Sequence, residues 1–273
     1  MKRHLPPFIG ILFLCGMAVL TCVPLLWALS GSFQTNSSLA ATPYSWFPPE
    51  PSPQNYADAV SVGNSGRAIL NSLVVALIIS SVGVVVAQMA GYVLAKHRFL
   101  GRDLLFWTIV STMLIPFPAI MVPVFIIARS FGLVDSLAGL ILPGLIASST
   151  VFFMRQYMQG LPDELLESAR VDGAGEWTTY WRIVFPLAWP VLISMALLTF
   201  VGSWNNFLWP LVVIQSPENM TIPLAMNSFK GQYFNNNVVM LAMSVLATLP
   251  VVVLFLLGRR RILDSVMVSG GLK

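Results

Sequence analysis

The chain has 273 residues, of which 56% are hydrophobic and 10% are charged, and its mean hydropathy is +0.79. These values exclude a soluble globular domain and are typical of a protein embedded in a membrane. The formal net charge is +4, from 15 Lys and Arg residues against 11 Asp and Glu residues.

Six charge-poor windows follow one another along the chain. A helix needs about 20 residues to cross the hydrocarbon core of a bilayer, and only a helix or a closed barrel satisfies its backbone there. We therefore predict an all-α, polytopic membrane protein with six transmembrane helices in a single domain, residues 1–273. The expected helices are an N-terminal anchor at 8–30 and core helices at about 68–95, 104–128, 136–156, 183–214 and 236–258.

The basic residues lie mostly on one side of these predicted spans. With the N-terminus in the cytoplasm, the inner side carries twelve of the fifteen, and the outer side carries Arg67, Arg129 and Lys230. Such a bias predicts that both termini and the loop at 159–182 are cytoplasmic. It also explains the net positive charge, so no nucleic-acid partner is expected.

The third predicted span contains Pro116, Pro118 and Pro123. Each proline removes a backbone hydrogen bond, and a membrane tolerates such breaks only against protein or a water-filled cavity. Transporters use broken helices of this kind near their substrate path. A static kink is the alternative for any one proline, but three within eight residues favour a functional break and place Pro116 near the path.

The loop after the fourth span, residues 161–190, is the longest charge-bearing stretch of the chain. Its acidic residues follow Pro162, which suits the first turn of a helix because the helix dipole favours negative charge there. Leu165, Leu166 and Ala169 give this short helix one apolar side, and Gly173 can supply the left-handed residue that ends it. A second helix is expected to begin near Gly175. These two helices and the turn between them would form an exposed helical hairpin suited to contact with another protein.

A spaced motif in this loop resembles that of a transporter family. Glu167-Ser168-Ala169 is followed after three residues by Gly173, after nine more by Ile183, and after one more by Phe185-Pro186. The membrane subunits of ATP-binding-cassette importers have the same spacing, with Ala in place of Ser168 and Leu in place of Phe185. The string Asp172-Gly173-Ala174 and the later Trp204-Asn205 resemble the carbohydrate-importing branch.

This resemblance implies a type I importer permease fold and a location in the bacterial plasma (inner) membrane. The implied partners are a second homologous permease, two cytoplasmic ATPases that bind ATP and Mg, and an extracytoplasmic solute-binding protein. This chain would then need no cofactor of its own. The loop at 161–186 would contact an ATPase through Glu164, Glu167, Ala169, Asp172, Gly173, Ile183 and Pro186.

The fifth predicted span ends in a polar and aromatic cluster, Trp204, Asn205, Asn206, Phe207 and Trp209. Asparagine in a membrane helix is costly unless it faces protein or water. Its amide can pair with sugar hydroxyls, and aromatic faces can pack on the apolar face of a pyranose. The cluster therefore predicts substrate contacts, made by Asn205 with Trp209 or by Asn206 with a carbonyl freed by Pro210, and flanked by Trp204. An interfacial aromatic belt is the alternative.

The sequence lacks the motifs of an ATPase or another enzyme. No lysine follows a glycine, which excludes a phosphate-binding loop, and we expect neither a catalytic site nor a metal site. The favoured function is half of the translocation path for a sugar or oligosaccharide. The alternatives are import of another polar solute, such as a glycerol-phosphate ester, and an ion-gradient-driven secondary transporter. The last is disfavoured because the predicted spans lack the acidic residues or histidine that couple an ion.

Overall fold

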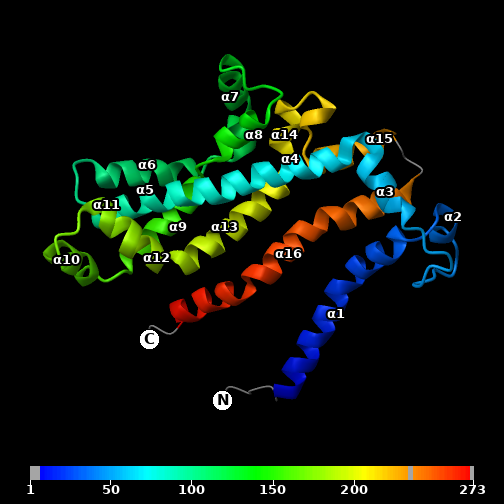
Figure 1. Cartoon of the computed structure of the whole chain (residues 1–273), viewed down its shortest axis with the longest axis horizontal. Helices are drawn as coiled ribbons and strands as arrows, with labels where there is room; N and C mark the ends of the chain where they lie inside the picture. The colour runs from blue at the N-terminus through cyan, green and yellow to red at the C-terminus, as the bar shows by residue number, and fades with distance from the viewer. Residues whose placement is uncertain (1–6, 233–235, 271–273) are drawn as a thin grey trace. The chain divides into compact units, whose positions relative to one another are not determined.

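The computed structural model describes residues 7–232 and 236–270 of the chain. Over these residues the chain is helical and has no β-strand, as Figure 1 shows. The predicted all-α class is therefore confirmed. The helices group into two compact units, Met1–Gly66 with Ala225–Pro250 and Arg67–Leu224 with Val251–Lys273. The assignment of one transmembrane domain to the whole chain stays a prediction.

The first unit contains the N-terminal helix α1 (Pro7–Ser32), which has 26 residues and no charged side chain. Its apolar side chains are mostly exposed, as expected of a helix that faces lipid. The amide of Asn55 donates to the carbonyl oxygens of Ser32 and Gln34 at 2.9 and 2.8 Å, and so ties the end of α1 to α3. The unit's other elements are α2 (Asn36–Leu39), α3 (Gln54–Ser61), η1 (Val62–Asn64) and parts of α15 (Ile222–Gln232) and α16 (Asn237–Gly270).

The second unit holds most of the helices that form the candidate site. It begins within α4 (Ser65–Ile78), which continues through the π-helical turn η2 (Ile79–Gly83) into α5 (Val84–Lys96). Then come α6 (Arg102–Thr112), α7 (Phe117–Ser130), α8 (Leu137–Gly144), α9 (Ser148–Gln159), α10 (Glu164–Val171), α11 (Glu176–Thr179), η3 (Tyr180–Val184), α12 (Phe185–Leu187), α13 (Trp189–Trp204), α14 (Leu208–Val213) and η4 (Pro217–Asn219).

Six membrane spans are available among the described residues. Three helical stretches are long and apolar enough to cross a membrane: Gly10–Ser32, Gln54–Lys96 and Asn237–Arg259. Three bent pairs pass the same test if each pair is one span: α6 with α7, α8 with α9, and the stretch Glu176–Leu187 with α13. This total agrees with the six predicted spans, and the fold is that of a six-helix polytopic membrane protein.

Three of the six spans among the described residues are bent at a break between two helices. The predicted proline break in the third span is present, because α6 and α7 meet at 104° and Pro116 caps α7. The fourth span bends by 41° between α8 and α9, which was not predicted. The helix expected at 183–214 bends by 72° near Ala188 and is interrupted again after Trp204.

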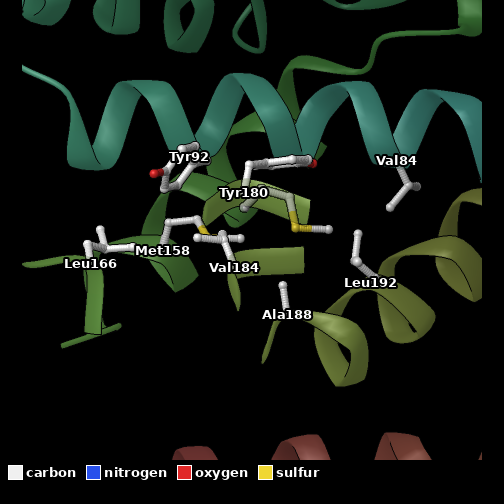
Figure 2. Packing of buried hydrophobic residues seen from close by; sticks show 9 residues of the cluster. Val84, Tyr92, Met158, Leu166, Tyr180, Val184, Ala188 and Leu192 are labelled. Carbon is white, nitrogen blue, oxygen red and sulfur yellow. The ribbon is translucent and has the colours of Figure 1, made fainter. Parts of the chain in front are cut away.

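A buried cluster connects the loop helix α10 to three longer helices. Figure 2 shows Leu166 of α10 at one end of this cluster, near Met158 of α9 and Tyr92 of α5. The other members come from α5, α9, η3 and α13, with Ala188 between α12 and α13, and the set is Val84, Tyr92, Met154, Met158, Leu166, Tyr180, Val184, Ala188 and Leu192. Through Leu166 this close-packed cluster joins α10 to α5, α9 and α13.

Among the described helices of the second unit, α5 and α9 share the most extensive contact, and Figure 1 shows the two side by side with α6. Gly91 makes this approach possible, because a Cβ atom at that position would lie 2.7 Å from the Arg155 backbone nitrogen and 2.8 Å from the Met154 Cβ atom. The buried Arg155 donates from Nε to the Leu94 carbonyl at 3.3 Å. Its guanidinium carbon lies 3.7 Å from the centre of the Phe106 ring, so the charge is held by a carbonyl and an aromatic face.

Candidate functional site

The first part of the candidate site is the loop helix α10. Its first turn carries Glu164 and Glu167, where the helix dipole favours negative charge. Before it, Asp163 pairs with the Lys96 ammonium at the end of α5. The hydrogen bond and charge of Lys96 lower the pKa of Asp163 below its ordinary value. This pair fixes the start of α10 to the end of a membrane span.

Gly173 ends α10 with a left-handed residue, as the sequence predicts. Its φ is +79°, its N–H donates to the Arg170 carbonyl at 3.0 Å, and the N–H of Ala174 donates to the Ala169 carbonyl at 2.9 Å. This pair of bonds satisfies carbonyls that the helix end leaves free. The next helix, α11, begins after Gly175, also as predicted.

The predicted loop residues divide into outward and inward groups. Glu164, Glu167, Asp172 and Gly173 are exposed. Ala169 is buried together with Leu166, whereas Leu165 is exposed, so the apolar side of α10 is narrower than predicted. Ile183 and Pro186 do not lie on this helix: they belong to η3 and α12, which follow it in the chain.

The second part of the candidate site is a cavity of about 420 Å³ within the second unit, contained between α8, α9, α13 and α14 with contributions from α4, η2 and α7. Its aromatic wall is Phe117 edge-on to Trp209, with ring centres 5.8 Å apart. The indole nitrogen of Trp209 is committed to the Gly139 carbonyl at 2.9 Å, so the ring is fixed. Polar groups also line the cavity: Ser149, Thr150, Thr199, Ser203, Asn206 and Thr221.

Two of the six predicted path residues line this cavity, Asn206 and Trp209. The other four, Trp204, Asn205, Phe207 and Pro116, are not among its lining residues. Trp204 is buried and stacked on Phe200, with ring centres 5.7 Å apart. Asn205 is exposed and donates its amide to the Val201 carbonyl at 2.9 Å, so it caps the end of α13.

The prediction that Pro210 breaks the fifth span is wrong. The helix ends at Trp204 and a new one begins at Leu208, so the break precedes Pro210. Pro210 falls in the first turn of α14, where a backbone N–H has no partner within the helix and its loss costs little. The Asn206 side chain accepts the Trp209 N–H at 3.4 Å. Asn205 caps α13 and Trp209 lies in α14, so the two predicted contact residues do not share one helix face.

The hydroxyl-bearing residues of the cavity and the aromatic side chains of Phe117 and Phe153 were not predicted from the sequence. The available signal was weak: isolated Ser and Thr residues in apolar windows. Such residues commonly bond to their own helix, and only the tertiary arrangement shows which of them face a cavity.

Comparisons with known proteins decide the family. Residues 83–264 match the family model described as "Binding-protein-dependent transport system inner membrane component". The chain belongs to this family. As an inner membrane component of a transport system, it is a membrane permease subunit and not an enzyme, and such a permease works with an ATPase partner.

Relatives of this inner membrane component cover nearly its whole length. It is 34% identical to the arabinooligosaccharides transport system permease protein AraQ of Bacillus subtilis, over 99% of each chain. It is also 34% identical to the sn-glycerol-3-phosphate transport system permease protein UgpE of Yersinia pestis, over 97% of this chain and 98% of the relative. The fold is similar to a chain in the crystal structure of a bacterial ABC transporter involved in alginate import, with a TM-score of 0.80, 22% identity, and coverage of 93% of this chain and 95% of that one.

Asp135 joins two segments of the permease next to the cavity. Its carboxylate accepts the backbone N–H groups of Gln215 and Ser216 at 3.1 and 3.0 Å and the Ser216 hydroxyl at 2.9 Å. Its own N–H donates to the Val213 carbonyl at 2.9 Å. These bonds, led by the Ser216 N–H, lower the pKa of Asp135 to about 2. Asp135 thus holds the start of α8 to the end of α14, and both helices line the cavity.

We expect Asp135→Asn to lower the free energy of unfolding by about 1 kcal/mol, because charge-assisted bonds become neutral ones at a partly exposed site. Asparagine also tolerates the left-handed φ of +58°, so the variant tests the charge and not the backbone. The folded-state pKa lies below the ordinary value of 3.8, so the carboxylate stabilises the fold above that value and this contribution is lost as the pH falls to about 2.

Thermal unfolding of the solubilised protein measures the difference in stability between the wild type and Asp135→Asn. The gap between wild type and Asp135→Asn should stay constant between about pH 5 and pH 8 and narrow only in stronger acid. A gap that changes near neutral pH would contradict this assignment.

Proposed function

We propose that this permease forms half of the translocation path for a sugar or oligosaccharide in a binding-protein-dependent, ATP-driven importer. Its partners are a second homologous permease, two cytoplasmic ATPases that bind ATP and Mg, and an extracytoplasmic solute-binding protein. The observation that carries the proposal is the joining of the exposed acidic helix α10, through Leu166, to the same helical unit that holds the cavity. Family membership supports the assembly, and AraQ, named for arabinooligosaccharides, supports the substrate class.

The loop at 161–186 serves as the mechanical link to the ATPase in this proposal. The exposed carboxylates of Glu164, Glu167 and Asp172 can pair with basic residues of the ATPase. The buried side chains of Leu166 and Ala169 hold the opposite side of the helix against the permease. ATP binding to the partner subunits closes them and displaces α10. The buried cluster then carries this displacement to α5, α9 and α13, and the cavity changes its access between two states.

The chemistry of the cavity favours a neutral, hydroxyl-rich solute. Ser, Thr and Asn side chains can pair with sugar hydroxyls, and the rings of Trp209 and Phe117 add an apolar wall. None of the residues described as lining the cavity is Lys, Arg or His. Import of a glycerol-phosphate ester is the second candidate, because UgpE, like AraQ, is 34% identical to this chain. An anionic phosphate would call for a cation in the path.

Substitutions of Asn206 and of the adjacent Asn205 test the substrate assignment. Asn206→Ser removes an amide from the cavity while keeping a side chain that can cap α14. The loss of one sugar hydrogen bond should weaken the apparent affinity in transport roughly 2- to 13-fold. Asn205→Ala is the matched control, because Asn205 lies outside the cavity lining, and should leave affinity unchanged.

The measurement is concentration-dependent uptake of labelled pentose and hexose oligosaccharides and of glycerol 3-phosphate. If Asn206→Ser and Asn205→Ala change the apparent affinity equally, Asn206 does not contact the substrate. If glycerol 3-phosphate is taken up and the oligosaccharides are not, the substrate is the phosphate ester and not a sugar.

The proposed topology places both termini and the loop at 159–182 in the cytoplasm of a bacterium. Single cysteines at Glu176 and Asn236, in a background lacking Cys15 and Cys22, are expected to react from opposite sides of the membrane. A membrane-impermeant maleimide applied to intact cells should label the Asn236 position and spare the Glu176 position until the cells are opened. Labelling of the Glu176 position in intact cells would reverse the topology and exclude contact with a cytoplasmic ATPase.

A further inference from the structure

A second cavity lies at the loop end of the spans, away from the proposed path. Its volume is about 440 Å³, and α5, the connection after it and α11 enclose it. An apolar groove of about 370 Å³ adjoins it, because Met89, Val93 and Phe99 line both. The groove is formed by one face of α5 and by Leu105 and Ile109 of α6, and its lining residues are all apolar. The two together have a polar end and a long apolar end.

The apolar groove runs along parts of two helices that belong to candidate membrane spans. From Val86 to Val93 on α5 it follows about 10 Å of helix. Within the hydrocarbon core of a bilayer, an apolar groove of this kind matches the chemistry of a lipid acyl chain. The exposed rings of Trp177 and Phe99 stand at the polar end, where aromatic side chains favour the boundary between lipid and water.

The polar end holds a hydrogen-bonding group that the chain itself does not satisfy. Tyr92 is 4% exposed, and its hydroxyl has no hydrogen-bond partner among the residues that the structure describes. Figure 2 shows this hydroxyl directed away from that of Tyr180, which donates to Gln88. A buried hydroxyl without a partner is costly, so a ligand oxygen at this end would be favoured.

Among the described charged side chains at the polar end, one basic residue has no acidic residue within salt-bridge distance. Glu176 is already balanced by Arg170 at 3.2 Å, and His97 lies 3.5 Å from its other oxygen. Lys96 and Arg102 pair with Asp163 and Asp103. Arg98 is exposed, lines the cavity and belongs to none of the salt bridges among the side chains that the structure describes, although its charge also contributes to lowering the pKa of Asp163. A phosphate group is the ligand chemistry that an unpaired guanidinium binds best at a membrane surface.

We propose that this cavity and groove bind one phospholipid with an anionic headgroup, from the leaflet at the loop end of the protein. Its phosphate contacts Arg98 and the Tyr92 hydroxyl, and one acyl chain occupies the groove between α5 and α6. Because Tyr92 belongs to the same buried cluster as Leu166, the bound lipid supports the packing beneath α10.

The test uses the full-length chain in lipid nanodiscs that contain a small fraction of phosphatidylglycerol with a diazirine on its acyl chain. After irradiation, peptide mapping locates the cross-links, and unlabelled phosphatidylglycerol is titrated as competitor. We expect cross-links within residues 86–109. Arg98→Gln should weaken the competition about fivefold, the effect of one basic residue at an anionic surface. Tyr92→Phe should weaken it roughly 2- to 13-fold.

Val93→Trp fills the groove and should abolish these cross-links. Two matched controls should leave them unchanged: Arg102→Gln removes a neighbouring cation that is already paired, and Leu77→Trp adds the same ring to an exposed apolar position outside the groove. Equal labelling by phosphatidylcholine and phosphatidylglycerol analogues, or labelling insensitive to Arg98→Gln and Val93→Trp, would overturn the proposal. So would protection of this surface by a copurifying protein subunit with no lipid cross-link.

Discussion

Gly173→Val is expected to abolish coupled transport while leaving the protein in the membrane in normal amounts. Gly173 has φ +79°, a region that a β-branched residue can enter only at a cost of about 1–2 kcal/mol or more. A Cβ atom there would meet no other atom within 4 Å, so the strain is confined to the turn after α10. The turn should open and α10 should lose its orientation toward the ATPase.

Gly175→Val is the matched control, because Gly175 lies two residues further, also has free space around a Cβ atom, and has an ordinary φ of −70°. Uptake and substrate-stimulated ATP hydrolysis of the complex measure the effect. A charge reversal at the exposed Glu167, Glu167→Lys, should produce the same loss through contact and not through strain. Normal transport by both Gly173→Val and Glu167→Lys would contradict the mechanical role of α10.

Gly91→Val is expected to destabilise the second unit more than any other single change considered. The added Cβ atom would meet backbone of α9 at 2.7 Å, and backbone cannot rotate away as a side chain can. Overpacking of this kind costs roughly 1–3 kcal/mol, and here it would also separate Arg155 from the Leu94 carbonyl.

The amount of protein in the membrane and the midpoint of its thermal unfolding should both fall for Gly91→Val. Gly16→Val serves as control, because the same residue type lies in a helix where no atom approaches within 4 Å. Equal stability of the two variants would contradict the close packing of α5 on α9.

The structure of the loop at 161–186 was predictable because its signals are local. The acidic first turn, the left-handed Gly173 and the start near Gly175 depend on neighbouring residues alone, and the spacing from Glu167 to Pro186 points to a family whose membership the comparisons confirm. The number of spans was predictable for a similar reason, since hydropathy over about 20 residues reflects the thickness of the bilayer.

The cavity was not predictable in the same way. In a span that is apolar on all sides, periodicity does not indicate which face is inward, so Asn205 and Asn206 are equivalent in sequence. The interruption between Trp204 and Leu208 gives them different environments, and no proline or glycine lies within it to announce the break. Thr150 and Thr199 come together with Asn206 only because α9, α13 and α14 converge.

The most direct test is reconstitution of the complex purified through this subunit into liposomes. In the presence of its solute-binding protein, we expect sugar uptake that requires ATP on the loop side, together with a copurified ATPase and a second permease. Glu167→Lys should remove this uptake without removing the permease. ATP-independent uptake by this chain alone, driven by an ion gradient, would contradict the account.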